Sequence, residues 1–471
     1  MHSIKLHLWP PRLMTLNETM NRVLSSLLFA SAACLGLQTL RPALAQTRES
    51  DAVKESQMQQ INLRMPAAMP IDQDRVSDAG VFVTAGQHVT IYSDIDDEPQ
   101  RLQWVKLFDA AIEQWCGLFD VDVKTTRPWH MTAIVMQDDQ DNSRIRNAGL
   151  IPADLPKFPA GYNRGHEFWV YLQKDEYYTR HLILHEGTHA FMQWFLGSSG
   201  TPWYSEGMAE WVALHHWDGQ SVELKQTITD KAQTPGWGRV KLLRNLVAKK
   251  DPKSLDDIFN TRPFAFRDVN SYAWCWAACE FLAHHPLSKE HFAKLPEQLR
   301  RSMFRFKTKF RAELHPHWQK LSRDWYLYIH EVGYGTDVAA CALKPVTQND
   351  DGSINVLATT SWQSTGITVE PSDRLQITGS GDFIVGETTQ PWRCEANGIT
   401  VEYYAGHPLG KLMAAVISVG PEQIVQVPVG SDSQKSVSFP RGGVLALRIN
   451  ESPAKLGDNS GALKVTIEKL E

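Results

Sequence analysis

Apolar and polar positions in the first part of the chain follow two different periods. The segments His88–Asp94, Met131–Gln137 and Glu167–Gln173 have the short alternating or apolar pattern of β-strands. Gln100–Phe119 instead has apolar residues at helical spacing, and a second helical segment follows the third strand, near His181. The order strand, helix, strand, strand, helix predicts a small mixed sheet backed by helices, in an α+β region.

The pattern changes twice more along the chain. Residues 221 to about 335 have helical spacing, as in SYAWCWAACEFLAHH (Ser271–His285). After about residue 340, short alternating runs such as RLQITG and VLALRI are separated by Gly, Pro, Asn, Asp and Ser. We therefore expect a subdomain with the sheet at residues 79–220, a helical subdomain at 221–340 and an all-β sandwich domain at 341–471.

The N-terminus has the features of a secretory signal. Arg22 precedes the apolar run Val23–Leu37, and Ala43-Leu44-Ala45 then forms a small-residue cleavage site. We predict a signal peptide at residues 1–45, a secreted or periplasmic protein, and no transmembrane helix after cleavage. The alternative is an uncleaved anchor. Residues 46–78 are polar without sustained periodicity, which is typical of a linker or pro-segment.

Composition and charge limit the classes of partner that we expect this protein to bind. The chain is 42% hydrophobic and 21% charged, as in ordinary globular proteins. Its net charge is −5, and loss of residues 1–45 removes four basic residues and one acidic residue, which gives −8. An acidic exported chain is a poor candidate for binding nucleic acid, so we expect no nucleic-acid partner.

The segment His185-Glu186-Gly187-Thr188-His189 is an H-E-x-x-H motif. On a helix, positions i and i+4 lie on one face, so both imidazoles can reach one cation. Glu186 then points toward a water on that cation. A catalytic zinc needs three protein ligands and one open position. The alternative is a helix whose His and Glu side chains have only structural roles.

A third ligand is available shortly after the motif. The turn GSSGTP interrupts the helix, and a new helix is predicted to begin near Trp203. Two antiparallel helices joined in this way would return Glu206 to the histidine pair. Glu210, one turn later, would accept a hydrogen bond from the far nitrogen of a ligand histidine.

These residues resemble a known family. HEGTHAFMQWF followed by PWYSEGMAEW (Pro202–Trp211) is similar to the gluzincin zinc metallopeptidases, particularly the peptidase-MA-like proteins, whose pattern is H-E-x-x-H and then W-x-x-E-G-x-A-E/D. The resemblance covers about residues 80–335. It implies a zincin-like fold with Zn²⁺ held by His185, His189 and Glu206, and Glu186 as the catalytic base. The G-x-M-x-N signature of the aminopeptidases is missing, so aminopeptidase activity is not implied.

Other polar residues are further candidates for the predicted site. Tyr272 matches a tyrosine that many relatives carry on a later helix, which implies an oxyanion donor; a tyrosine packed in an aromatic core is the alternative. His181 lies one turn before His185 and either lines the cleft or packs in the core. The remaining histidine pairs are expected to be structural or exposed: His215, His216, His284, His285, His315 and His317.

The C-terminal region carries a second resemblance. The segment RINESPAKLGDNSG (Arg448–Gly461) resembles the loop of small calcium-dependent galactose-binding lectins of bacteria, which has N-D and then G-N-N-S-G. This implies that Glu451, Asp458 and Asn459 occupy Ca²⁺ or sugar ligand positions, and that glycans are partners. Lys455 stands where the lectins have a threonine ligand, and an ammonium group is unfavourable beside a hard cation. The alternatives are a plain turn and an accessory sandwich of unknown ligand.

Five cysteines remain after the signal peptide, so at least one thiol is unpaired within the chain. Both Cys341 and Cys394 lie near the start of the β region, and we predict a disulfide between them. Cys275 and Cys279 are four apart on an apolar helical stretch, which favours packing. No pair has zinc-finger spacing.

The leading hypothesis from the sequence is an exported zinc metallopeptidase that hydrolyses protein or peptide substrates with a metal-activated water. One alternative is a non-catalytic carbohydrate- or surface-binding protein that retains a zincin fold. Another is zinc-dependent hydrolysis of a bond other than a peptide bond, since substrate choice depends on cleft loops.

Overall fold

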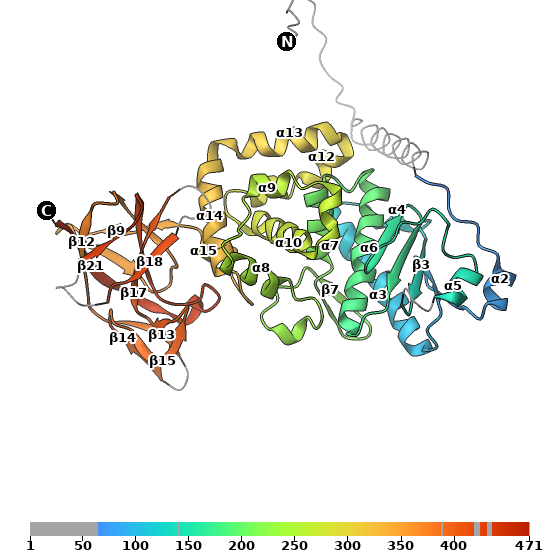
Figure 1. Cartoon of the computed structure of the whole chain (residues 1–471), viewed down its shortest axis with the longest axis horizontal. Coiled ribbons are helices and arrows are strands. Elements are labelled where there is room, and N and C mark those ends of the chain that lie inside the picture. The colour runs from blue at the N-terminus through green and yellow to red at the C-terminus, as the bar shows by residue number, and fades with distance from the viewer. Residues whose placement is uncertain (1–64, 139–141, 388–389, 419–423, 431–435, 471) are drawn as a thin grey trace, which may run out of the picture. The chain divides into compact units, whose positions relative to one another are not determined.

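The computed structural model describes residues 65–138, 142–387, 390–418, 424–430 and 436–470, and all of them belong to one compact unit (Figure 1). The predicted signal peptide and residues 46–64 lie outside the described residues. The end of the predicted linker forms helix α2 (Gln73–Asp78), whose N-cap Asp72 accepts hydrogen bonds from two backbone amides. Among the described residues, every helix is too short or too polar to cross a bilayer.

A five-stranded mixed sheet lies in the first half of the described chain. Its strands are β1 (Phe82–Ala85), β2 (Val89–Ser93), β3 (Met131–Met136), β4 (Gly161–Arg164) and β5 (Glu167–Tyr171), in the order β1-β2-β3-β5-β4. Strands β2, β3 and β5 are parallel, whereas β1 and β4 are antiparallel edges. The mixed sheet and its three central strands are therefore confirmed, while the two short edge strands have too little pattern to be predicted.

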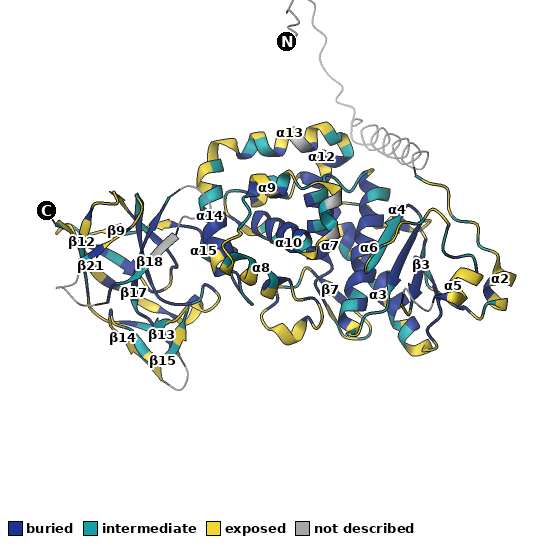
Figure 2. Ribbon diagram, in the orientation of Figure 1, coloured by how far each residue is buried: buried dark blue, intermediate teal, exposed yellow. Residues whose placement is uncertain are grey.

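Helices α3 (Glu98–Phe119) and α6 (Glu176–Leu196) pack against one face of this sheet (Figure 1). Alternation along β5 explains the two faces: Phe168 and Val170 join the core with α3 and α6, whereas Trp169 joins a smaller core on the other face. In Figure 2, α6 and the central strands are almost entirely buried. A helix this apolar on all sides has its polar residues inside the protein rather than on its surface.

The residues after the sheet are helical, with one short hairpin, β6 (His215–Trp217) and β7 (Val222–Leu224). The helices are α7 (Pro202–Val212), α8 (Arg239–Ala248), α9 (Leu255–Phe259), α10 (Val269–His284), α11 (Lys289–Phe292), α12 (Leu295–Arg301), α13 (Met303–Leu314), α14 (Trp318–Glu331) and α15 (Val338–Cys341). Two short helices, α4 (Val123–Thr126) and α5 (Ser143–Asn147), lie earlier, between strands of the sheet. One apolar core extends from Val89 to Cys341, so the sheet and the helical region share it.

Helices α7 and α10 approach each other closely at Gly207. A Cβ atom at this position would overlap with the carbonyl oxygen of Cys275 and with Sγ of Cys279. Only glycine therefore permits this separation of the two helices. Since Gly207 follows Glu206 directly, the packing against α10 also fixes where Glu206 lies.

Residues 344–470 form a β-rich region with its own core. The strands are β8 (Lys344–Pro345), β9 (Thr347–Gln348), β10 (Ile354–Leu357), β11 (Gln363–Val369), β12 (Arg374–Ser380), β13 (Phe383–Glu387), β14 (Pro391–Cys394), β15 (Ile399–Tyr404), β16 (His407–Leu409), β17 (Leu412–Ile417), β18 (Ile424–Pro428), β19 (Ser436–Ser438), β20 (Gly443–Ile449) and β21 (Ser460–Leu470). One sheet of seven strands contains β12 and β21, and another of five contains β17 and β20. Leu375 and Leu463 of the first meet Leu412 and Leu445 of the second in one core, which is the arrangement of a sandwich.

The helical and β regions are joined by a buried polar cluster. Glu331, the last residue of α14, accepts hydrogen bonds from Arg448 on β20 at 2.5 Å, from the Tyr404 hydroxyl at 2.5 Å and from Trp362 Nε1 at 3.4 Å. The guanidinium of Arg448 also lies over the Trp362 ring, 4.5 Å from its centre. The β region is therefore fixed to α14 by directional contacts as well as by apolar packing.

The predicted disulfide between Cys341 and Cys394 is wrong. Both thiols are free and buried, as are those of the other three described cysteines. The physical reason is that Cys341 lies in the core of the helical region, whereas Cys394 lies in the core of the β region. Cys275 and Cys279 pack on α10, as their spacing predicts.

Candidate metal centre

The H-E-x-x-H motif lies in the middle of α6, and Glu206 lies in the second turn of α7. Helix α6 ends at Leu196, and α7 begins with Pro202 at its first position, where the missing amide hydrogen costs nothing. This short turn brings the two helices together, as the sequence predicts. His185 and His189 are buried, while the Glu206 side chain keeps 21% exposure.

Three predicted ligand atoms converge on one point. His185 Nε2 and His189 Nε2 are 3.2 Å apart, and Oε2 of Glu206 is 3.4 Å from the first and 3.3 Å from the second. Ligand atoms about 2.0–2.1 Å from a tetrahedral zinc lie about 3.3 Å from one another. The triangle therefore has the size that a zinc ion requires, and two nitrogens with one carboxylate oxygen are ligands that zinc prefers.

The electrostatics of this triangle favour a positive charge. Burial alone would lower the pKa of His189, but the charge of Glu206 and its hydrogen bond raise it to about 9. Burial would likewise raise the pKa of Glu206, yet His189 and the hydrogen bonds from both histidines hold it well below its usual range. The donor set thus stabilises a cation at the point where its atoms meet.

Glu186 is buried directly beside the ligand pair, with 5% of its surface exposed. Burial raises the pKa of Glu186 to about 8, against the opposing effect of His189. Its carboxylate lies against Gly161 of the edge strand β4, where a Cβ atom would overlap with Oε1. A carboxyl group with this pKa can take up and release a proton near neutral pH.

The contact with Gly161 leads to a prediction. In Gly161→Ala, the new methyl group must displace the Glu186 carboxylate, because the strand backbone is held by its pairing with β5. Under the sequence hypothesis of a zinc metallopeptidase, we expect zinc content to be unchanged and peptide hydrolysis to fall by at least about tenfold, since small displacements of a catalytic group are costly. Gly117→Ala, on the exposed side of α3 with open space where the methyl group would lie, controls for general effects. Wild-type turnover in Gly161→Ala would contradict the placement of Glu186.

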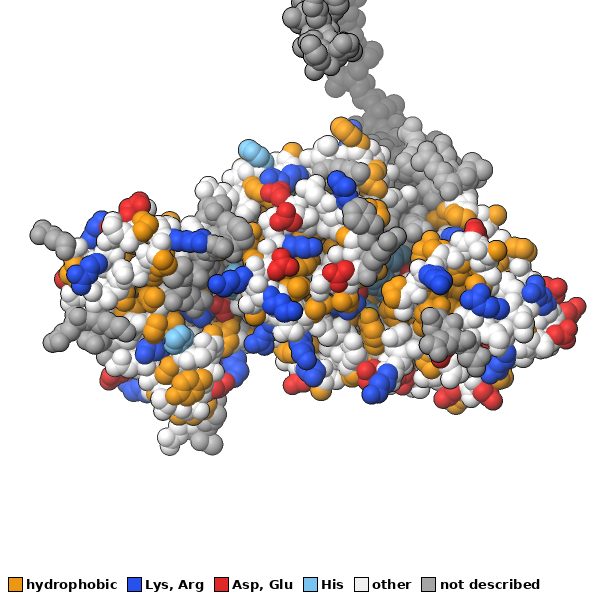
Figure 3. All heavy atoms as spheres, viewed as in Figure 1, with side chains coloured by type: hydrophobic (Ala, Val, Ile, Leu, Met, Phe, Trp, Pro, Cys, Tyr) orange, Lys and Arg blue, Asp and Glu red, His pale blue; other side chains and the backbone are white. Residues whose placement is uncertain are grey.

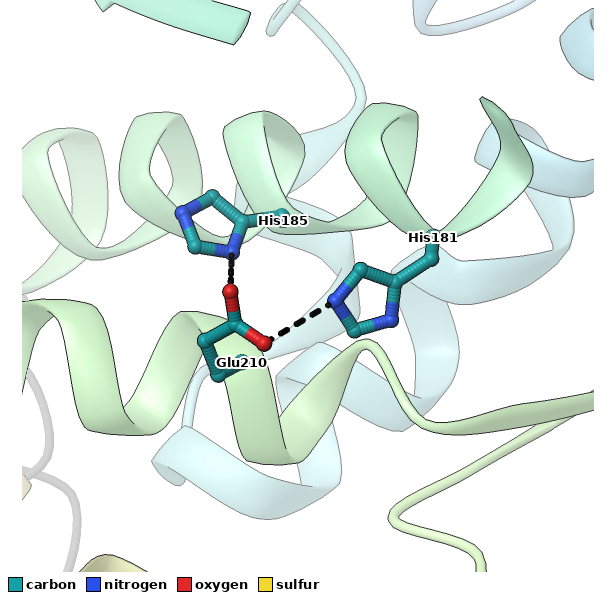
Figure 4. Close-up of side chains that lie close together, drawn as sticks. All are labelled: His181, His185 and Glu210. Atoms are coloured by element: carbon teal, nitrogen blue, oxygen red, sulfur yellow. Dashed lines mark ion pairs between the residues drawn. The ribbon is translucent and has the colours of Figure 1, made fainter. Parts of the chain in front are cut away.

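Glu210 faces the other side of His185. One of its oxygens lies 3.8 Å from His185 Nδ1, too long for a hydrogen bond, and the other lies 3.4 Å from His181 Nε2. Figure 4 shows both histidines pointing from α6 toward this carboxylate on α7. His181 is fully buried and its Nδ1 donates to the carbonyl of Ala213, so it packs in the core rather than lining a cleft.

Sequence reasoning missed three polar neighbours of the site. The Ser205 hydroxyl lies 3.2 Å from His189 Nδ1 and fixes that ring. Trp237 and Arg239 donate to Glu210. Burial would raise the pKa of Glu210, but the charge of Arg239 and the nearby His181 hold it well below its usual range. Ser205 directly precedes Glu206 in the sequence, so its contact with the site could have been predicted. Nothing in the local pattern links residues 237 and 239 to the motif.

Tyr272, the predicted oxyanion donor, lies on α10 with its ring centre 6.2 Å from that of His185. Phe266 contacts the ring edge-on at 5.0 Å. Burial raises the pKa of its hydroxyl, which therefore stays protonated and able to donate. Within the described residues, the other histidines are structural or exposed as expected; His215 stacks on Tyr177, and His285 bonds Asp324.

In the β region, the predicted ligand residues lie around a cavity of about 410 Å³ lined by Glu451, Asp458, Lys455, Glu402 and Trp392, among others. Lys455 Nζ binds Glu402 at 2.6 Å, so an ammonium charge already lies in this cavity. The third predicted residue, Asn459, is buried and donates to Glu451 at 2.7 Å. Binding of Ca²⁺ or glycans here stays a prediction.

Figure 3 shows acidic and basic side chains interspersed over the face that it presents.

Comparison with known proteins gives a weak likeness to solved structures. No family model matches the chain, and no curated protein matches it. Among solved structures, a chain described as "EclA N-terminal domain; PllA-like lectin" is 21% identical, with 26% of this chain and 98% of that chain covered and a TM-score of 0.21. A TM-score of this size does not establish a shared fold.

Proposed function

We propose that this protein is an exported zinc metallopeptidase of the gluzincin type, with a zincin-like catalytic region. The observation that carries the proposal is the convergence of His185, His189 and Glu206 at the spacing of zinc ligands, with the buried Glu186 beside them. Zn²⁺ with three protein ligands and an open position lowers the pKa of water and polarises a carbonyl group.

The chain's own residues supply the proton transfers. Glu186, buried beside the ligand pair, would take a proton from the attacking water and later give it to the leaving nitrogen. The Tyr272 hydroxyl donates a hydrogen bond to the oxyanion that develops on the scissile carbonyl. Partial exposure of Glu206 leaves one side of the site open to substrate.

A peptide substrate is supported by the edge strand β4. Within the part of the chain that the structure describes, this strand pairs only with β5, so its other edge is one to which an extended peptide can add. Asn163, two residues after Gly161, lies on the same face of the strand as that glycine. Its side-chain amide is shielded from solvent and has no hydrogen-bond partner within the described residues.

Metal analysis tests the site. We expect about one zinc per chain in the wild type, and loss of that zinc in His185→Ala because a two-ligand site binds far more weakly. Elemental analysis of the mature protein gives the measurement, and His216→Ala, an exposed histidine on β6, is the matched control. Well-folded wild-type protein that takes up no added zinc would overturn the proposal and leave the binding-protein alternative.

A further inference from the structure

A buried guanidinium group lies next to the candidate metal centre. Arg239, the first residue of α8, is only 6% exposed. Its NH2 and Nε atoms donate to the two oxygens of Glu210 at 2.8 and 3.2 Å, and Trp237 Nε1 donates to the same carboxylate at 2.9 Å. A two-point contact between a planar guanidinium and a carboxylate fixes both groups in orientation. Glu210 is therefore held in one position.

Arg239 also contacts the other helices that carry the site. On α6, Tyr178 accepts a hydrogen bond from Arg239 NH2 at 3.2 Å. On α10, the ring of Tyr272 has its centre 5.9 Å from the guanidinium carbon. One side chain from α8 thus reaches α6, α7 and α10 in the space behind His185.

Two possible metal-binding groups share His185, and the charge of Arg239 indicates which of them can bind a cation. His181, His185 and Glu210 have ligand atoms close enough for a second cation. Arg239 already neutralises Glu210 there, and a divalent ion beside a buried guanidinium would be strongly repelled. The carboxylate, whose oxygen lies 3.8 Å from His185 Nδ1, then orients that ring by its charge rather than by a hydrogen bond, and it does not itself bind metal.

We propose that Arg239 is a positioning residue for the zinc ligand His185, which it orients through Glu210 while filling the place of a second cation. The inference rests on the proposed function, because His185 must bind zinc. Partners of this kind behind a histidine ligand tune its direction and basicity, and their loss weakens metal binding. No contact between Arg239 and substrate is needed.

The test is a zinc titration of the full mature chain in competition with a chromophoric chelator. We expect Arg239→Gln to lower zinc affinity by roughly 10- to 100-fold. Arg239→Lys keeps the positive charge but not the two-point contact, so we expect its zinc affinity to lie between those of Arg239→Gln and the wild type. In a double-mutant cycle, Arg239→Gln combined with Glu210→Gln loses no more affinity than Glu210→Gln alone. The visible spectrum of bound Co²⁺ should also change, because the geometry at His185 changes.

Each result decides the matter. Unchanged zinc affinity in folded Arg239→Gln, or losses that add in the double variant, overturns the inference and leaves the zinc site intact. If Arg239→Gln fails to fold, Arg239→Lys is titrated in its place, because it loses the two-point contact with Glu210, and an unchanged zinc affinity there overturns the inference too. Absence of zinc in the wild type removes the proposed function as well. Arg101→Gln, equally buried but bonded to Thr84 and Ile95, is the control and should keep full affinity.

Discussion

Glu186→Gln is expected to bind zinc as the wild type does and to hydrolyse peptides roughly 10²- to 10⁴-fold more slowly. The substitution keeps the size of the side chain and its fit against Gly161, but an amide cannot accept the proton of the attacking water. The ligand triangle does not include Glu186, so the metal is retained. The measurement is the single-turnover rate on a fluorogenic peptide library, paired with elemental analysis of each preparation.

A matched carboxylate controls for the loss of a buried negative charge. Glu280 lies on α10, where burial raises its pKa to about 7, and it bonds Tyr328 rather than any ligand residue. Glu280→Gln should keep wild-type turnover. Turnover that persists in Glu186→Gln would reject this residue as the base. Zinc-loaded wild-type protein that cleaves nothing in a broad library would instead favour the non-catalytic binding protein.

The candidate site was largely predictable because its geometry is local. Residues four apart on a helix must share a face, and a turn of few residues limits where Glu206 can lie. The three central strands were predictable for a similar reason, since strands buried on both faces have a strong apolar pattern.

The unpredicted features depend on packing between distant segments. Gly161 meets Glu186, and Arg239 meets Glu210, only after the sheet and four helices have assembled. No period in the sequence carries that information. The predicted disulfide failed in the same way: Cys341 is close in sequence to the β region, but its side chain belongs to the helical core.

The polar cluster between α14 and the β region predicts a large effect on stability. Arg448→Met should lower the free energy of unfolding by about 3–5 kcal/mol, because it leaves the Glu331 carboxylate buried without its cation. Replacing both residues, in Glu331→Leu with Arg448→Met, should cost less than the single change, since no uncompensated charge remains. Urea denaturation followed by tryptophan fluorescence gives the values.

An exposed pair in the same β region provides the contrast. Arg393 pairs with Asp382, and their side chains are 74% and 50% exposed. Arg393→Met should leave the urea midpoint almost unchanged, because water screens and solvates both charges. If Arg448→Met also left the urea midpoint unchanged, the buried pair would contribute no more to stability than the exposed pair. Apolar packing of Trp362, Met413 and Leu327 would then be what joins α14 to the β region. A large loss of stability in the single variant, with recovery in the double variant, would show that the cost comes from an uncompensated buried charge.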